Sequence, residues 1–173
     1  MVRALILLLL LPAAAQAEVP ARYRQAAAEY GLPAKVVYAV ALTESGTQLQ
    51  SGRARPWPWT LNIEGRGHYY ATREAAYRAL KVYLDRGGRR ADVGLMQIHW
   101  RAHRRLLRDP WAALDPMFNL RVGAYLLRER WQAAGNLWQA IGHYHAPSRP
   151  ERAAWYRRQV ARRLGQLRAD GVS

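Results

Sequence analysis

The stretch that decides the fold spans residues 36–46 and reads VVYAVALTESG. In a helix, Val36, Val40 and Glu44 would share one face, because residues four apart lie about one turn apart. Ser45 and Gly46 then indicate where the helix stops. The pattern therefore predicts an apolar helix whose last turn carries a carboxylate on its buried face.

Glu44 is the candidate catalytic residue of this segment. Burial disfavours the charged form of a carboxylate, and so does the negative end of a helix dipole. A carboxylic acid that keeps its proton near neutral pH is what general acid catalysis requires. The alternative, from spacing alone, is a frayed helix end with Glu44 turned to solvent.

The first 17 residues have the pattern of an export signal. Arg3 gives a basic start, an apolar run extends from Ala4 to Leu11, and Ala15 and Ala17 have the spacing of a signal-peptidase site. The run is shorter than the ~20 residues that a membrane-spanning helix needs. We expect an exported, periplasmic protein from which residues 1–17 are removed; the alternative is an uncleaved anchor.

The composition is strongly basic and contains no cysteine. The 173 residues include 27 Lys and Arg against 12 Asp and Glu, a net charge of +15, and only Lys35 and Lys81 are lysines. Without disulfides the fold must depend on packing, which a chain of this length allows. A basic surface favours polyanions such as cell-wall polymers or lipid head groups; the alternative is a solvated basic surface.

Helical patterns dominate the chain outside residues 51–71. Trp59–Ile63 and His68–Tyr70 predict a β-hairpin around the turn Glu64-Gly65-Arg66-Gly67. Helices are expected over residues 18–30, 33–44, 72–86, 100–108, 115–134, from 136 onward and from 148 onward. Their predicted N-caps include Thr72, Asp115, Asn136 and a capping box at Ser148–Glu151. We expect a mainly α single domain with a small β-hairpin insertion.

Three segments taken together resemble the lytic transglycosylase family, which has a lysozyme-like fold of the SLT or goose type. They are Glu44-Ser45, the GLMQI of residues 94–98 and the AIGHY of residues 140–144. Residues 115–126 resemble the family's structural helix, and the match covers about residues 30–146. The PWPWTLN of residues 56–62 is similar to a subgroup associated with integrating conjugative elements and secretion apparatus.

The resemblance implies cleavage of peptidoglycan between N-acetylmuramic acid and N-acetylglucosamine. The muramic C6 hydroxyl would close onto C1 and leave a 1,6-anhydro end. Glu44 would be the sole catalytic acid and then base, Tyr144 would hydrogen-bond near Glu44 and orient it, and Ser45 would support the site. Residues 18–173 would form the catalytic domain, with an insert over about residues 50–92.

The substrate groove is expected to combine the GLMQ backbone with aromatic side chains of the insert. Aromatic faces suit pyranose rings, although aromatic residues more often belong to a core. His145 stands where the family has asparagine, so the sequence does not decide whether the substrate contact at that position is kept. The candidate substrate-binding residues are Gly94, Leu95, Met96, Gln97, Trp57, Trp59, Tyr69, Tyr70 and His145.

The residue inventory is compatible with a one-carboxylate enzyme. Ordinary glycosidases use two carboxylates, and near these segments the only other acidic residue is Asp92. His99 and His103 have helical spacing, but Trp100 stands where the zinc-protease pattern needs glutamate. We therefore expect no metal and no cofactor.

The leading hypothesis is a peptidoglycan lytic transglycosylase that acts as a monomer, opens the wall locally and serves a conjugation or secretion apparatus. The alternatives are a lysozyme-type hydrolase on the same fold and a non-catalytic cell-wall-binding assembly subunit. The net charge alone would suit a nucleic-acid binder, but the sequence has no nucleic-acid motif, and we expect no nucleic acid as a partner.

Overall fold

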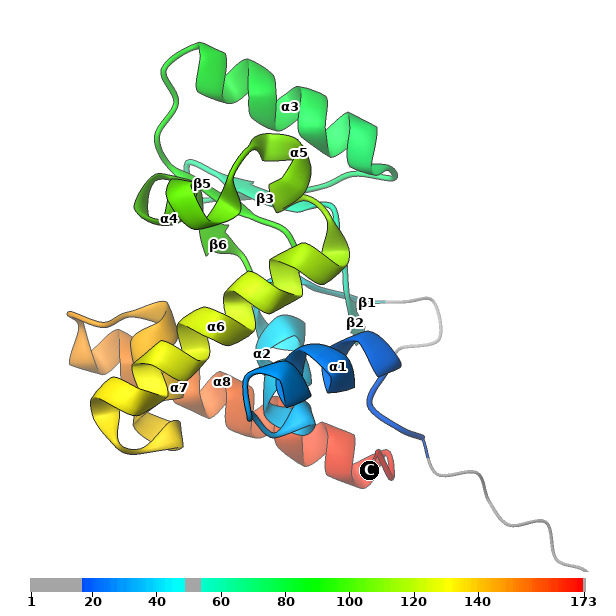
Figure 1. Cartoon of the computed structure of the whole chain (residues 1–173). Helices are drawn as coiled ribbons and strands as arrows, with labels where there is room; N and C mark the ends of the chain where they lie inside the picture. Colours follow the sequence, from blue (N-terminus) through cyan, green and yellow to red (C-terminus); the bar gives the residue numbers. More distant parts are fainter. Residues whose placement is uncertain (1–16, 49–53, 173) are drawn as a thin grey trace, which may run out of the picture.

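The computed structural model describes residues 17–48 and 54–172, so the predicted leader, apart from Ala17, lies outside the described residues. These residues form a helical half and a half built around a small sheet (Figure 1). The helical half contains α1 (Ala21–Glu29), α2 (Ala34–Ser45), α7 (Leu137–His145) and α8 (Pro150–Ala169). The sheet half contains α3 (Arg73–Asp85), α4 (Trp100–Leu107) and α5 (Pro110–Ala113). The long helix α6 (Pro116–Ala134) runs diagonally between them.

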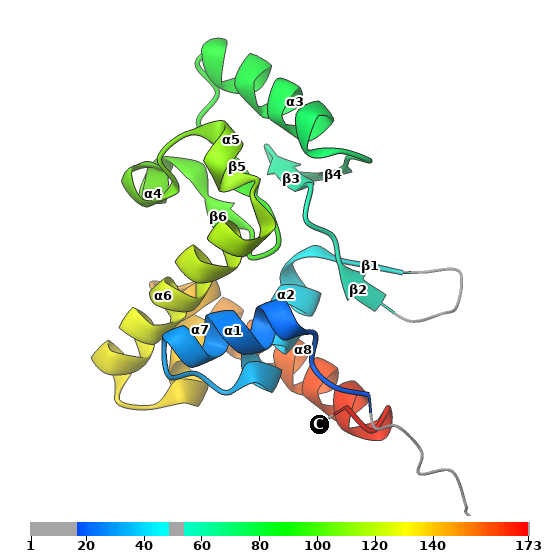
Figure 2. The same ribbon diagram turned by 45° about the vertical axis from the view of Figure 1, so that its right-hand side comes forward.

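The main sheet has four antiparallel strands in the order β4-β3-β5-β6. They are β3 (Thr60–Ile63), β4 (Arg66–Tyr69), β5 (Ala91–Val93) and β6 (Ile98–His99). A separate two-stranded sheet joins β1 (Gly46–Gln48) to β2 (Ala54–Pro56) directly after α2. In both ribbon views it lies between the two halves (Figures 1 and 2).

The predicted hairpin is confirmed as β3–β4, with a shorter turn than expected. Ile63 pairs with Arg66, so Glu64 and Gly65 alone form the turn. Both have positive φ angles, 51° and 84°, as a type I′ turn requires.

Helix α2 lies at the centre of the helical half, in contact with α1, α8 and β2. Val37, Val40 and Ala41 are fully buried. The side chain of Glu44, in the last turn, is only 12% exposed. The alternative in which Glu44 turns to solvent is therefore not found.

Three predicted N-caps are confirmed. Thr72, Asp115 and Asn136 each accept a hydrogen bond from the amide three residues later. These bonds satisfy amides that have no partner within the helix. Gly135, directly after the helix predicted over residues 115–134, is in the left-handed conformation with φ 65°.

Two helix starts were predicted wrongly, both next to a proline. Helix α1 begins at Ala21, not at residue 18, because Val19 precedes Pro20 and is driven out of the helical region. Helix α8 begins at Pro150, and its N-cap Arg149 makes no side-chain capping bond. Ser148 lies one residue too early to form the predicted capping box.

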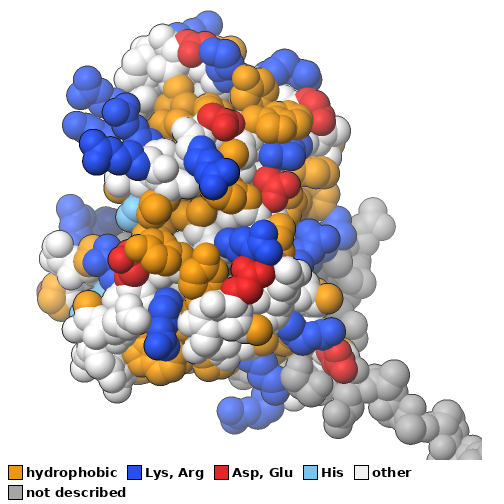
Figure 3. Space-filling model, viewed as in Figure 1, with side chains coloured by type: hydrophobic (Ala, Val, Ile, Leu, Met, Phe, Trp, Pro, Cys, Tyr) orange, Lys and Arg blue, Asp and Glu red, His pale blue; other side chains and the backbone are white. Residues whose placement is uncertain are grey.

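Positive charge gathers on particular helices. Figure 3 shows a cluster of Lys and Arg side chains at the upper left, over α4. The exposed arginines of α4 and its C-cap are Arg101, Arg104, Arg105 and Arg108. Helix α8 carries others along its outer face, so the basic surface predicted from composition is divided between both halves.

Candidate active site

Glu44 projects from the last turn of α2 toward residues of α7 and α8. Its Oε1 lies 3.8 Å from His145 Nδ1, and the His145 side chain is 36% exposed. The ring of His145 stacks on that of Tyr156, with centroids 4.5 Å apart and an interplanar angle of 3°. The carboxylate therefore lies beneath a partly exposed imidazole whose orientation is fixed by packing.

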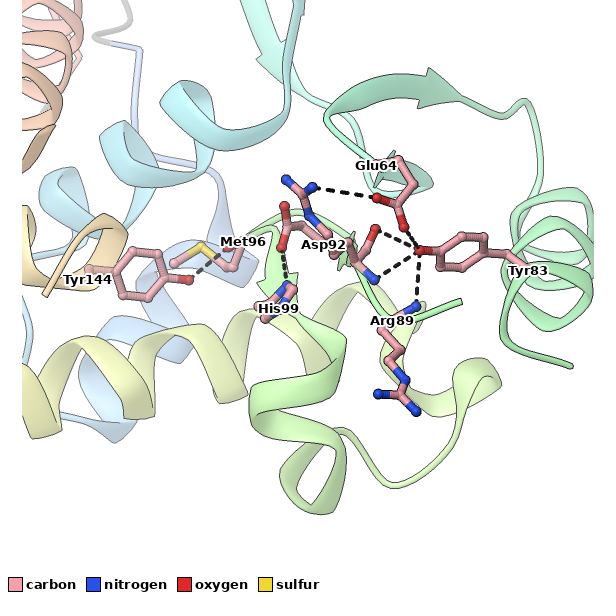
Figure 4. Close-up of polar contacts among 8 residues, drawn as sticks. Glu64, Tyr83, Arg89, Asp92, Met96, His99 and Tyr144 are labelled. Carbon is pink, nitrogen blue, oxygen red and sulfur yellow. Dashed lines mark hydrogen bonds and ion pairs between the residues drawn. The ribbon is translucent and has the colours of Figure 1, made fainter. Parts of the chain in front are cut away.

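The hydroxyl of Tyr144 differs from the sequence-based expectation. It donates its hydrogen bond to the backbone oxygen of Met96 at 2.8 Å, not to Glu44 (Figure 4). Burial, followed by the negative charges of Glu44 and Asp92, raises the pKa of Tyr144 well above its usual value. The tyrosine thus stays protonated beside the carboxylate and joins α7 to the segment before β6.

Tyr156 is a site residue that the sequence did not single out. Its side chain is 1% exposed, and its hydroxyl has no hydrogen-bond partner within normal geometry among the described residues. Burial and the nearby charge of Glu44 raise the pKa of Tyr156. Its hydroxyl therefore lies close to Glu44. The helical periodicity of residues 150–169 indicates only that Tyr156 faces inward, and it does not indicate which side chain Tyr156 contacts.

The segment Gly94–Gln97 forms a turn held from behind by Asn119. Asn119 Oδ1 accepts from the Met96 amide at 2.9 Å, and its Nδ2 donates to the oxygens of Val93 and Ala113. Gly94 has φ 80°, and a Cβ added there would come within 2.5 Å of the Asn119 side chain. Glycine is therefore required both by the backbone conformation and by the close approach of Asn119.

The same turn is joined to the end of α2. Ser45, which is buried, donates a hydrogen bond to the Leu95 oxygen at 2.8 Å. Gln97 has a positive φ of 44°, and its side-chain amide donates to the oxygens of Thr60 and Gly94 at 3.1 and 2.8 Å. Ser45 and Tyr144 therefore fix the turn from two different helices beside Glu44.

Asp92 and His99 form a pair across β5 and β6, where they are register partners. Asp92 Oδ1 lies 2.9 Å from His99 Nδ1 (Figure 4). Because Asp92 contributes to the raised pKa of Tyr144, its charge acts near the site. It is the second carboxylate that the sequence pointed to.

The comparison with protein families gives one match, which covers residues 22–162 and is described as the transglycosylase SLT domain. The chain belongs to this family. The SLT domain has a lysozyme-like fold, which agrees with the mainly helical architecture, and its members are lytic transglycosylases that act on peptidoglycan. No curated protein and no solved structure matches the chain.

The aromatic residues predicted to bind substrate do not all gather at Glu44 in this SLT domain. Trp57 and Trp59 contact edge to face, with ring centroids 5.9 Å apart. They line a cavity of about 370 Å³ together with Tyr38, and Glu44 is not among its lining residues. Tyr38 and Glu44 are six residues apart in α2, which separates them by about 120° around the helix. This cavity therefore lies on another face of α2.

The two tyrosines of the hairpin have different environments. Tyr69 is 56% exposed on β4. Tyr70 is partly buried, and its backbone oxygen accepts a hydrogen bond from Trp57 Nε1 at 2.7 Å. At the other end of the insert, Tyr83 receives the amide hydrogens of Arg89 and Arg90 and bonds to Glu64 (Figure 4). These bonds hold the insert of the SLT domain together.

Within residues 17–48 and 54–172, no three His, Asp or Glu side chains converge on a point that could hold a metal ion. His99 is paired with Asp92. His103 lies partly buried, and burial together with the Arg130 charge lowers its pKa. None of the helices in these ranges is long and apolar enough to cross a bilayer.

Proposed function

We propose that this protein cleaves the β-1,4 bond between N-acetylmuramic acid and N-acetylglucosamine and forms a 1,6-anhydro end. The observation that carries the proposal is the environment of Glu44. This carboxylate is 12% exposed in the last turn of α2, close to the buried Tyr156 and the half-buried Tyr144. Such a group can exchange a proton with a sugar oxygen while it remains shielded from bulk water.

In the first step, the carboxylic acid of Glu44 gives its proton to the glycosidic oxygen. The bond between this oxygen and muramic C1 breaks, and N-acetylglucosamine leaves with a free hydroxyl. The 2-acetamido oxygen of the substrate stabilises the cationic C1, as in substrate-assisted glycosidases. A second carboxylate is not needed for this step.

In the second step, the muramic C6 hydroxyl oxygen bonds to C1. Its proton passes to the carboxylate of Glu44, which returns to the acid form. No water is consumed, so the sum of the product masses equals the substrate mass. The residues that position the reaction are Tyr144 and Ser45, because they fix the Gly94–Gln97 turn on which the substrate would lie.

The cellular setting is part of the proposal. We infer that residues 1–17 are an export leader and that residues 18–173 act in the periplasm as a monomer. The tract at residues 56–62 supports service to a conjugation or secretion apparatus, where a local opening in the wall is required. The aromatic residues Trp57, Trp59, Tyr69 and Tyr70 would contact glycan beyond the reacting sugars, and none of them needs to touch Glu44 for that role.

A lysozyme-type hydrolase is the second candidate, and the Asp92–His99 pair favours it. A carboxylate held by an imidazole 2.9 Å away could orient a water molecule in place of the C6 hydroxyl. The reaction would then consume water and leave a reducing muramic acid end.

Mass analysis of products from purified sacculi tests the proposal. We expect muropeptides with anhydro ends, each lighter by one water than the hydrolysis product. Reducing ends alone would establish the hydrolase, and release of neither product by well-folded protein would favour a wall-binding subunit. The Glu44→Gln protein serves as the inactive reference.

A further inference from the structure

A cavity of about 280 Å³ opens where α7 joins α8. Among the described residues, its lining includes two arginines and a histidine and no Asp or Glu. The lining residues are His145, Ala146, Pro147, Ser148, Arg149 and Arg152. This composition favours an anionic group, and arginine is suited to carboxylates because its planar fork can donate two parallel hydrogen bonds.

The cavity lies one side chain away from Glu44. His145 belongs to the cavity lining, while its Nδ1 is 3.8 Å from the Glu44 Oε1. Stacking on Tyr156 at 4.5 Å holds the imidazole in this position. The cavity and Glu44 are therefore close enough for one substrate molecule to reach both.

We propose, on the basis of the proposed function, that this cavity binds a carboxylate on the lactyl arm of the muramic acid whose bond is cleaved. The arm is attached at C3, which is two bonds from the reacting C1 in the sugar ring. It therefore projects close to the site of proton transfer. N-acetylglucosamine has no such arm. The cavity thus places muramic acid, and not N-acetylglucosamine, on the C1 side of the bond.

Two forms of peptidoglycan supply this chemistry. In peptide-free glycan the arm ends in its own carboxylate, close to the sugar ring. In peptide-bearing glycan that carboxyl is an amide, and the carboxylates belong to the stem peptide farther out. Both are anions on the same arm, and they can be separated by choosing the ligand.

Binding to the Glu44→Gln protein provides the test, because this variant is expected to hold glycan without cleaving it. The probes are peptide-free glycan strands, peptide-bearing strands, and each of these after its carboxylates have been amidated with methylamine. We expect at least one unmodified form to bind about tenfold more tightly than its amidated counterpart, a factor that corresponds to about 1.4 kcal/mol. The form that shows the difference identifies the source of the carboxylate.

When Arg149→Gln and Arg152→Gln are added to the Glu44→Gln protein, we expect the tenfold difference in affinity to disappear. The matched control replaces Arg158 and Arg162, which are exposed on the same helix and do not line the cavity. It removes the same two charges, and we expect the tenfold difference to remain.

Equal binding of amidated and unmodified glycan by the Glu44→Gln protein would overturn the inference without any arginine variant. Equal weakening by the two arginine pairs would also overturn it, because general attraction would then explain binding. Neither result affects the formation of anhydro ends by the wild-type protein. Failure of the proposed function would instead appear as the absence of anhydro ends among the products of the wild-type protein.

Discussion

Glu44 lies where a helix end, two phenol hydroxyls and an imidazole meet. Tyr144 reaches it from α7 and Tyr156 from α8, and burial raises the pKa of both. These phenols are neutral when protonated, so they shield the Glu44 side chain from water without adding a charge beside it.

Replacement of Glu44 by Gln should abolish turnover and leave the fold intact. The amide matches the carboxylic acid in size but cannot donate the proton, so we expect kcat to fall by about 10³-fold or more. Glycan affinity should stay within a few fold. The measurements are anhydro-product formation and equilibrium binding, with Glu151→Gln at an exposed position of α8 as the control. Equal loss of binding and turnover would indicate a structural role for Glu44.

Replacement of Asn119 by Ala should destabilise the fold strongly. Its side chain makes three buried hydrogen bonds to backbone groups, and the variant leaves those groups without partners. We expect the free energy of unfolding to fall by about 3 kcal/mol. Urea denaturation measures it, and Asn136→Ala, which removes an exposed N-cap, should cost only about 1 kcal/mol. Similar losses for the two variants would contradict the assigned role of Asn119.

The sequence indicated some site residues and not others for a physical reason. Glu44 could be predicted as partly buried because helical periodicity gives the face on which a residue lies. The hydrogen-bond partner of Tyr144 could not be predicted. Its hydroxyl bonds to the Met96 oxygen and not to Glu44 because of where a segment 48 residues away lies in the fold. The position of Tyr156 near Glu44 could not be predicted either, for the same reason.

At the level of elements, the approach of α6 to the Gly94–Gln97 turn depends on a glycine. A Cβ added at Gly123 would come within 2.5 Å of the Met96 side chain. We expect Gly123→Ala to lower the free energy of unfolding by about 1–3 kcal/mol through overpacking. It should also lower kcat, because the displaced Met96 carries the oxygen that accepts from Tyr144.

Gly165→Ala is the matched control for that prediction. Gly165 lies inside α8, and a Cβ there would meet nothing within 4 Å. Alanine favours the helix more than glycine does, so this variant should be more stable by about 0.5–1 kcal/mol. If both alanine variants change the free energy of unfolding in the same way, the close approach of Met96 is not what makes alanine unfavourable at position 123.

The elements themselves could be predicted to different degrees. Caps at Thr72, Asp115 and Asn136 are local, so the sequence reveals them. The pairing of β3 with β5 is not local: β5 has three residues and lies beyond α3 in the chain. A strand of that length has too few residues to show an alternating pattern.

For the whole molecule, buried phenols predict loss of stability in alkali. Burial raises the pKa of Tyr23, Tyr144 and Tyr156. The fold therefore favours the protonated phenols, and their contribution is complete below the unfolded value of about 10. As the pH rises from there toward the folded pKa, we expect each to reduce the free energy of unfolding by up to about 1.4 kcal/mol per pH unit.

The Tyr156→Phe variant provides the measurement. Urea unfolding at a series of alkaline pH values should give a shallower loss of stability than the wild type, because one titrating phenol is gone. Tyr69→Phe, at an exposed position, should leave the slope unchanged. Identical slopes for all three proteins would mean that Tyr156 does not remain protonated in the fold.

Most of the fold class follows from the sequence, and the arrangement of its halves does not. Helical periodicity and the absence of cysteine already indicate a mainly helical domain held by packing. The position of the sheet half relative to α2 depends on single contacts such as that of Ser45 with Leu95, 50 residues apart.

The contribution of α8 also bears on how the site is assembled from distant segments. The phenol ring on which His145 stacks comes from this helix. A chain without α8 would carry Glu44 without that covering, because Tyr156 belongs to this helix. The surroundings of Glu44 are therefore complete only when α8 has packed against α2.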